Sequence, residues 1–248
     1  MSAIYILWLR QLKRYVRSRP RLVASFGQPL LFLVALGFGL GPVFRRAGEG
    51  SYLQFLAPGI IAMTVLFTAI FAGVELIWDR QFGFLKETLV APVPRILIMM
   101  GRTLGGATVA MIQGVVVVGI CFLAGFRITN YAALPVAFVF LALIGVTFTA
   151  LGTGIACMLD DFQGFQLVMN FLVMPIFFLS GALFPLDGVP VGIAIAATAN
   201  PLSYGVDGLR AALTGRGHFS TPLDLVVLAA TATVFLAAGS YLFSKIEA

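Results

Sequence analysis

The sequence predicts an all-α membrane protein built on six transmembrane helices. Of its 248 residues, 60% are hydrophobic and only 10% are charged, and the mean hydropathy is +1.03. An average soluble domain carries about a quarter charged residues, and a soluble core of this size has no room for so much apolar surface. The composition therefore excludes soluble, disordered, collagen-like and disulfide-stapled proteins.

Six apolar runs are long enough to cross a bilayer core about 30 Å thick, because a helix rises about 1.5 Å per residue. These runs cover residues 22–40, 55–78, 104–126, 134–159, 165–184 and 223–243. A seventh run, at 189–198, is too short to cross and is bounded by Pro190 and by Asn200-Pro201. We expect a re-entrant or interfacial segment there.

The chain is predicted to be one membrane domain, 1–248. Its parts are an amphipathic segment (1–21), spans one and two (22–78), a helical loop (79–95), spans three to five (96–184), an outer segment (185–222) and span six with the tail (223–248). Lys and Arg resist translocation, and eleven of the sixteen fall on the side of the two chain ends. Both termini are therefore expected in the cytoplasm. The net charge of +6 lies beside apolar segments, so it is interpreted as orientation charge rather than as a surface for nucleic acid.

Residues 4–17 are predicted to form an amphipathic helix in the membrane plane. On a helical wheel, Ile4, Trp8, Leu12 and Tyr15 share one face. The opposite face carries Arg10, Lys13, Arg14 and Arg17. We expect the basic face to meet anionic lipid headgroups and Trp8 to lie at the interface. Orientation charge without a defined helix is the alternative.

The loop between spans two and three carries a second amphipathic pattern. Phe82, Leu85 and Leu89 fall at i, i+3 and i+7, so they form an apolar stripe that faces away from Arg80 and Glu87. The prolines at positions 92 and 94 end the pattern. Such a helix rests either on the lipid interface or in a groove of a partner protein, and periodicity alone leaves both open.

Five polar side chains lie inside otherwise apolar spans: Gln28, Gln113, Thr147, Thr149 and Asn170. Hydrocarbon cannot satisfy them, so they face other helices or a cavity, and helix packing is favoured over contact with a transported molecule. Glu75, about one turn from the inner end of span two, is interpreted as an acid paired with a nearby base, with a proton relay as the alternative.

The outer segment is too apolar for an ordinary surface loop, which is the alternative interpretation. Asp207 and Arg210 lie at i and i+3, a spacing that allows an ion pair. His218 is the only histidine and has no Cys, His or carboxylate cluster around it in the sequence. We predict no catalytic residue, no metal site and no cofactor bound by this chain.

The chain is not expected to hydrolyse ATP. A P-loop needs a Gly-Lys pair, and none of the three lysines (13, 86 and 245) follows a glycine. Energy must then come from a partner or from an ion gradient. A gradient-driven carrier is disfavoured by the scarcity of buried charge, and a membrane-embedded enzyme by the lack of a catalytic constellation.

Three motifs together resemble the ABC type-2 permease family, which includes the daunorubicin-resistance-type and nodulation-protein-J-type export permeases. They are FLAPGII at 55–61, ETLVAPVPR at 87–95 and NPLSYGVDGLR at 200–210, and their order and spacing cover nearly the whole chain.

The resemblance implies a type-2 ABC exporter fold in the inner membrane of a prokaryote. It implies a homodimer whose two subunits each bind a separate ATPase, and ATP and Mg would bind to that ATPase. The 79–95 region would be the coupling helix, with the ATPase contact at Phe82, Leu85, Glu87, Leu89 and Pro92. The outer segment would form short helices beside the exit, carrying Asn200, Pro201, Tyr204, Asp207 and Arg210. Relatives carry drugs, lipids or lipid-linked glycans, and no residue here chooses among them.

Overall fold

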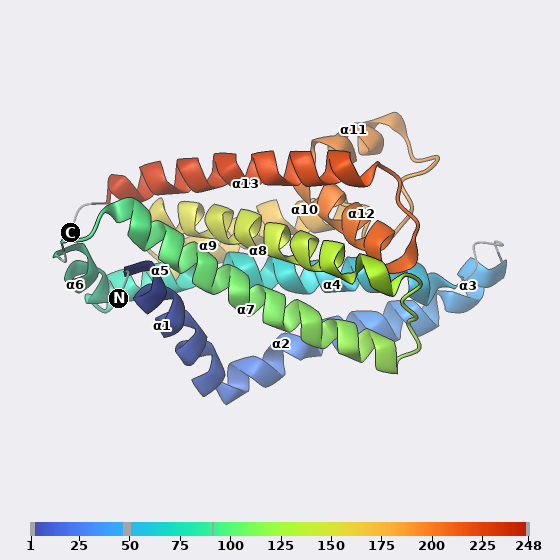
Figure 1. The fold of residues 1–248 in the computed structure, drawn as a ribbon, viewed down its shortest axis with the longest axis horizontal. Coiled ribbons are helices and arrows are strands. Elements are labelled where there is room, and N and C mark those ends of the chain that lie inside the picture. Colours follow the sequence, from blue (N-terminus) through green and yellow to red (C-terminus); the bar gives the residue numbers. More distant parts are fainter. Residues whose placement is uncertain (1–2, 47–50, 91, 247–248) are drawn as a thin grey trace.

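The structure, a computed structural model, describes residues 3–46, 51–90 and 92–246; the side chains of residues 19–25, 45, 46, 86, 87 and 89 lie outside the description. Throughout these ranges the regular elements are helices and none is a strand. The predicted all-helical class is confirmed. Figure 1 shows the helices running roughly along one long axis, so the molecule is an elongated bundle.

Four helices of the bundle are long and apolar enough to cross a membrane. They are Tyr52–Gln81, which comprises α4 (Tyr52–Phe71) and α5 (Val74–Gln81); α7 (Arg95–Leu123); Tyr131–Cys157, which comprises η2 (Tyr131–Ala133) and α8 (Leu134–Cys157); and α13 (Thr221–Ser244). The second, third, fourth and sixth predicted spans are thereby confirmed as helices of spanning length. α4 runs through the middle of the bundle (Figure 1), and most of its residues are buried.

The first and fifth predicted spans are broken into shorter pieces. The first comprises α2 (Arg19–Phe32) and a π-helical stretch, η1 (Leu33–Phe38). The fifth comprises α9 (Phe162–Val168), a second π-helical stretch, η3 (Met169–Val173), and α10 (Met174–Phe178). π-helical turns interrupt the regular ladder of backbone hydrogen bonds, and Pro29 and Pro175 add further breaks. The six-span count therefore stays a prediction for these two segments.

Small residues allow the helices to approach closely. At the joint between α4 and α5, a Cβ added to Gly73 would come within 2.3 Å of the carbonyl oxygen of Gly152 on α8. On α7, a Cβ added to Gly105 would come within 2.7 Å of the Gln11 side chain on α1 (Ala3–Arg17). Gly73 thus lets α8 approach backbone against backbone, and Gly105 leaves room for a side chain of α1, as expected where lipid offers no hydrophobic drive for association.

The bundle has two distinct ends (Figure 1). We call the end that holds both described termini, α1, α5 and α6 (Phe84–Val90) the terminal end. The opposite end, which we call the distal end, holds α3 (Gly41–Arg46) and α11 (Val191–Ala199), with α12 (Pro201–Thr214) close by. The predicted outer segment thus forms two short helices at the end opposite the termini.

Candidate functional site

At the terminal end, a buried carboxylate joins three helices. Asp79 on α5 is 2% exposed. Its two carboxylate oxygens accept from Arg10 on α1, at 3.0 Å, and from the buried Arg102 on α7. Arg14, also on α1, lies 3.6 Å from the same carboxylate. A buried acid shared by several guanidiniums ties α1, α5 and α7 together, because separating them would leave charges unpaired in an apolar interior.

Glu75 lies one turn before Asp79 and is also buried. Its carboxylate is 3.7 Å from the guanidinium of Arg14. The interpretation of Glu75 as a paired acid is therefore confirmed. The base comes from α1, some sixty residues away in the chain, a partner that the sequence alone could not identify.

α1 packs along α7 instead of standing alone. Gln11 and Tyr15 are buried, and the Trp8 indole N–H donates to the Thr108 hydroxyl at 3.0 Å. Among the four basic residues of this helix, Arg10 and Arg14 turn toward the acids of α5, while Lys13 and Arg17 are exposed. Contact of the remaining basic face with lipid headgroups stays a prediction.

Two further arginines of the terminal end cap helix C-termini. Arg80 donates to the carbonyl oxygens of Leu159 and Cys157, at 3.1 and 3.3 Å, just past α8. Arg95 donates to the carbonyl oxygens of Ser244 and Ile246, at 2.6 and 2.7 Å, at the end of α13. The last carbonyls of a helix lack partners within it, so both guanidiniums stabilise ends that would otherwise remain unsatisfied.

The predicted apolar stripe of the coupling helix is split in the structure. Leu85 is 3% exposed and packs into the core, whereas Phe82 is 72% exposed. The reason is Gly83, whose φ of +79° ends α5 in a left-handed turn, so Phe82 precedes α6 and does not share a face with Leu85. The exposed apolar side chains of this segment are Phe82, Phe84 and Val90. Pro92 follows the helix and is exposed, and the side chains of Glu87 and Leu89 lie outside the described part.

The five polar residues of the spans divide into two groups. Gln113, Thr147 and Thr149 are buried between helices; Gln113 accepts from the Thr68 hydroxyl on α4, and Thr147 donates to the Leu143 carbonyl at 2.7 Å. Gln28 on α2 and Asn170 on η3 are exposed on the surface of the single chain. Both exposed residues belong to the two broken helices.

The start of α12 is fixed by side-chain hydrogen bonds. Asn200 caps the helix by accepting from the Leu202 N–H at 3.0 Å, and it donates to the Ile176 carbonyl at 2.6 Å. Pro201 stands in the first turn, where its missing N–H costs nothing. The Tyr204 hydroxyl donates to the Thr198 carbonyl at 2.8 Å, and its ring stacks on Phe219. α11, α12 and α13 are thereby held in one arrangement at the distal end.

Asp207 and Arg210 bind separate groups instead of each other. The Asp207 carboxylate accepts from the backbone N–H groups of His218 and Phe219, at 2.8 Å each. The Arg210 guanidinium donates to the Gly181 carbonyl at 2.8 Å and lies 4.0 Å from the centre of the Phe55 ring. The ion pair that their spacing allows is replaced by these contacts, because the chain folds back to bring residues 181, 218 and 219 within reach.

A family model for the ABC-2 type transporter matches residues 2–214. The chain belongs to the ABC-2 type transporter family. Three curated relatives agree with this. Nodulation protein J of Rhizobium leguminosarum bv. trifolii is 31% identical over 215 residues, which are 85% of this chain and 78% of the relative. The ycf38 protein of Cyanophora paradoxa is 33% identical over 213 residues, 85% of this chain and 73% of its own. The inner membrane transport permease YadH of Escherichia coli strain K12 is 26% identical over 216 residues, 86% of this chain and 83% of its own.

Three buried charged residues of this ABC-2 type permease were missed as site residues from the sequence. Asp79 and Arg102 look like ordinary loop and orientation charges, and only their meeting at the α5–α7 contact marks them. Asp224, in the first turn of α13, is 0% exposed, and neither of its carboxylate oxygens has a hydrogen-bond partner among the described residues. Its place just inside the sixth apolar run could have flagged it, because acids within a predicted membrane span are rare.

Proposed function

We propose that this chain is the membrane subunit of an ATP-driven exporter, energised by a separate ATPase. The observation that carries the proposal is the family match over residues 2–214 in a sequence without a P-loop. ATP and Mg would bind to the partner, and this chain would convert ATPase closure into rocking of its spans. Such a step is a rigid-body switch driven by a local ligand event.

The proposed ATPase contact is the surface around α6. Phe82, Phe84 and Val90 expose apolar side chains there, and exposed apolar patches beside polar surroundings are typical of protein contacts. The ion pairs among α1, α5 and α7 lie at the same end of the bundle and would carry a push on α6 into the spans.

The proposed partner in the membrane is a second copy of this chain. Gln28 and Asn170 are polar yet exposed on helices that belong in the membrane, so hydrocarbon alone would leave them unsatisfied. α2, which carries Gln28, contacts α10, the helix that directly follows η3, through the Phe32 and Phe177 rings, whose centres are 6.2 Å apart. Pairing of two such faces would cover both side chains or place them on a path between the subunits.

The terminal end is proposed to face the cytoplasm of a prokaryote, with both termini inside and lipid around the exposed apolar spans. The excess of Lys and Arg on that side and the name of the inner membrane permease YadH support this placement. The proposed cargo is an amphipathic or hydrophobic molecule: a drug, a lipid or a lipid-linked glycan.

The test introduces a charge on the proposed docking surface. Phe84→Asp is expected to release the ATPase in a co-purification and to abolish ATP-dependent uptake into inverted vesicles. The matched control is Leu123→Asp, an equally apolar exposed position at the end of α7, which should retain the ATPase. Equal retention by both variants would contradict docking at α6, and uptake without any ATPase would contradict the proposed energy source.

An ion-gradient-driven carrier is the second candidate, and one observation favours it. Asp224 is a fully buried carboxylate without a hydrogen-bond partner in the described part of the chain, and such groups occur in proton relays. Substitution of this residue separates the two candidates, as argued in the Discussion.

A further inference from the structure

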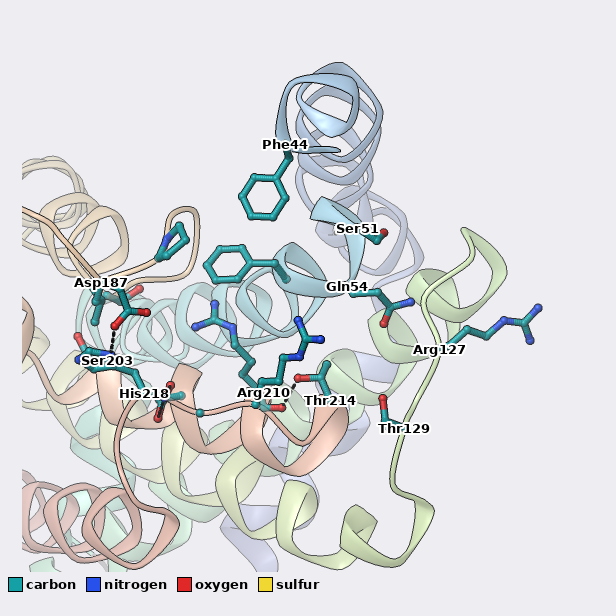
Figure 2. Close-up of a pocket in the computed structure, with 17 residues that line it drawn as sticks. Phe44, Ser51, Gln54, Arg127, Thr129, Asp187, Ser203, Arg210, Thr214 and His218 are labelled. Carbon is teal, nitrogen blue, oxygen red and sulfur yellow. Dashed lines mark hydrogen bonds and ion pairs between the residues drawn. The ribbon is translucent and has the colours of Figure 1, made fainter. Parts of the chain in front are cut away.

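The distal end contains a cavity of about 510 Å³, to which the proposed function assigns no role (Figure 2). Its walls come from α3, from the start of α4, from α12, and from the connections that follow α7, α10 and α12. Pockets of about 300–1,000 Å³ are the usual size for small ligands. The cavity is therefore large enough to hold the polar end of an organic molecule.

The lining of this cavity carries three arginines against two acids. Arg210 lies on α12, and Arg216 follows that helix, is exposed and has no hydrogen bond or ion pair within the described ranges of the chain. The two acids of the wall are already engaged: Asp207 accepts the two backbone N–H groups after Gly217, and Asp187 lies 2.9 Å from the His218 ring nitrogen. Burial lowers the pKa of Arg210 to about 10, with Asp207 opposing the shift, so the guanidinium is still charged at neutral pH.

Two donors at the cavity lack acceptors. The Ser203 side chain is 1% exposed, and its hydroxyl has no hydrogen-bond partner. The Nε of Arg210 is also buried and unpartnered, although the Nη2 of the same guanidinium donates to Gly181. A buried donor without an acceptor is destabilising, because its lost hydration is not replaced by a hydrogen bond. Both donors line the cavity, so an acceptor that enters it would relieve that destabilisation.

Apolar side chains complete the lining. Phe44, Phe55 and Leu186 contribute them, and the Phe55 ring lies directly beside the Arg210 guanidinium, whose carbon is 4.0 Å from the ring centre. We propose that the distal cavity binds the oxyanion headgroup of an amphiphile, a phosphate, sulfate or carboxylate, with the adjoining carbon chain against Phe44 and Phe55. The oxyanion would accept from Arg216, from the free Nε of Arg210 and from Ser203. The proposal deepens the proposed export function and rests on it for placing this cavity on the exit side.

Binding is testable on the full-length permease alone, without ATPase, in micelles of a neutral polyoxyethylene detergent, which carries no oxyanion. The probes are decyl sulfate, decyl maltoside as a neutral amphiphile with the same tail, and inorganic sulfate as a free anion, each measured by native mass spectrometry. Decyl sulfate should bind at least about tenfold more tightly than either control, because a charge-assisted hydrogen bond and an apolar tail contribute separately.

Matched arginine variants locate the site. Figure 2 shows the Arg127 side chain at the cavity rim directed away from its interior, so Arg127→Gln removes the same charge without removing a contact. Arg216→Gln should weaken decyl sulfate binding about tenfold, Arg216→Lys should restore most of it, and Arg127→Gln should leave it within about twofold. Ser203→Ala should also weaken binding.

Three results would overturn the proposal. If decyl maltoside binds as tightly as decyl sulfate, the cavity does not recognise an oxyanion. If inorganic sulfate binds as tightly as decyl sulfate, the cavity does not recognise the apolar tail of an amphiphile. Equal weakening by Arg216→Gln and Arg127→Gln would reduce the effect to general surface charge. Since no transport is measured, failure of the export function would leave these binding results unchanged.

Discussion

The two ends of the bundle treat their arginines in opposite ways. At the terminal end, Arg10, Arg14 and Arg102 meet carboxylates of the same chain, and Arg80 and Arg95 cap helices. At the distal end, Arg216 has no partner in the described residues, and Arg210 and Ser203 leave buried donors without acceptors. The Nε of Arg102 at the terminal end is also unpartnered, but Arg102 pairs with Asp79 and borders a cavity of only about 10 Å³, which is too small for a ligand. Charges satisfied within the chain hold elements together, whereas unsatisfied donors around a cavity are available to a ligand.

The difference assigns separate tasks to residues of the same type. The terminal arginines tie α1, α5 and α7 together near α6, and under the proposed function this stiff joint would transmit a push from the ATPase. The distal arginines leave a cavity that can hold an anionic headgroup. Substitutions at the first end should therefore act on stability and coupling, and substitutions at the second on binding.

The largest effect is expected from Asp79→Ala. The substitution leaves the buried Arg102 guanidinium without its carboxylate, and breaking a buried pair from one side costs about 3–5 kcal/mol. We expect lower thermal stability of the purified permease and loss of transport, measured by a melting curve in detergent and by vesicle uptake.

The control for this change is Asp160→Ala. Asp160 also accepts from an arginine, Arg80 at 2.6 Å, but its side chain is 93% exposed, so the loss should be small. Adding Arg102→Met to Asp79→Ala should recover part of the stability, because it removes the stranded charge. Similar melting temperatures for Asp79→Ala and Asp160→Ala would refute the stiff joint.

A smaller effect is expected from Gly208→Ala, which tests whether the distal cavity depends on where α12 lies. A Cβ at Gly208 would come within 2.1 Å of the Phe140 ring on α8, and overpacking of this kind costs about 1–3 kcal/mol. The shift of α12 should also displace Arg210 and weaken decyl sulfate binding.

Gly192→Ala on α11 is the matched control, because a Cβ there meets nothing within 4 Å. Phe140→Leu combined with Gly208→Ala should restore binding by making room for the methyl group. Unchanged binding in Gly208→Ala would mean that the cavity does not need the packing of α12 on α8.

Sequence patterns predicted the long helices better than the breaks within helices and the contacts between them. Hydropathy located the four long spans, since an apolar run of spanning length has one stable form in lipid. It could not reveal the π-helical breaks η1 and η3, which depend on packing between helices. The prediction that Phe82 and Leu85 share one helix face was wrong for a local reason. Periodicity assumes a continuous helix, and the helix ends at Gly83, between the two residues.

The candidate sites were predictable only in part. Charge position singled out Arg10, Arg14 and Arg210, but their partners lie far away in the sequence. The i, i+3 rule paired Asp207 with Arg210 and was overridden by backbone groups of a returning loop. Ser203 carries no sequence signal, since only burial without a partner distinguishes it from an ordinary serine.

An effect of about 1 kcal/mol in the stabilising direction is expected from Asp224→Asn. The change removes a carboxylate that is fully buried without a hydrogen-bond partner in the described structure, and it preserves side-chain size. Under the ATP-driven function, melting temperature should rise slightly and vesicle uptake should persist. If uptake is lost while ATP turnover stays normal, and if added ATPase does not restore uptake, the gradient-driven candidate is favoured instead.

The smallest effect is expected from pH, and it tests whether Arg210 supplies the charge of the distal cavity. Burial lowers the pKa of Arg210 from 12.5 to about 10. Between these values the unfolded chain binds more protons than the folded one, so this group makes stability rise with pH only above about pH 10. Below that, Arg210 is charged in both states and contributes no pH dependence.

Decyl sulfate keeps its charge over this range, so its binding should stay constant from about pH 7.5 to 9 and weaken above about pH 10 as Arg210 loses its proton. The same profile is expected in His218→Gln, because Asp207 is held by the backbone N–H of residue 218 and not by its ring. Binding that stays constant above about pH 10 would show that Arg210 does not supply the charge. The contrast between bound arginines at one end and available ones at the other would then rest on Arg216 alone.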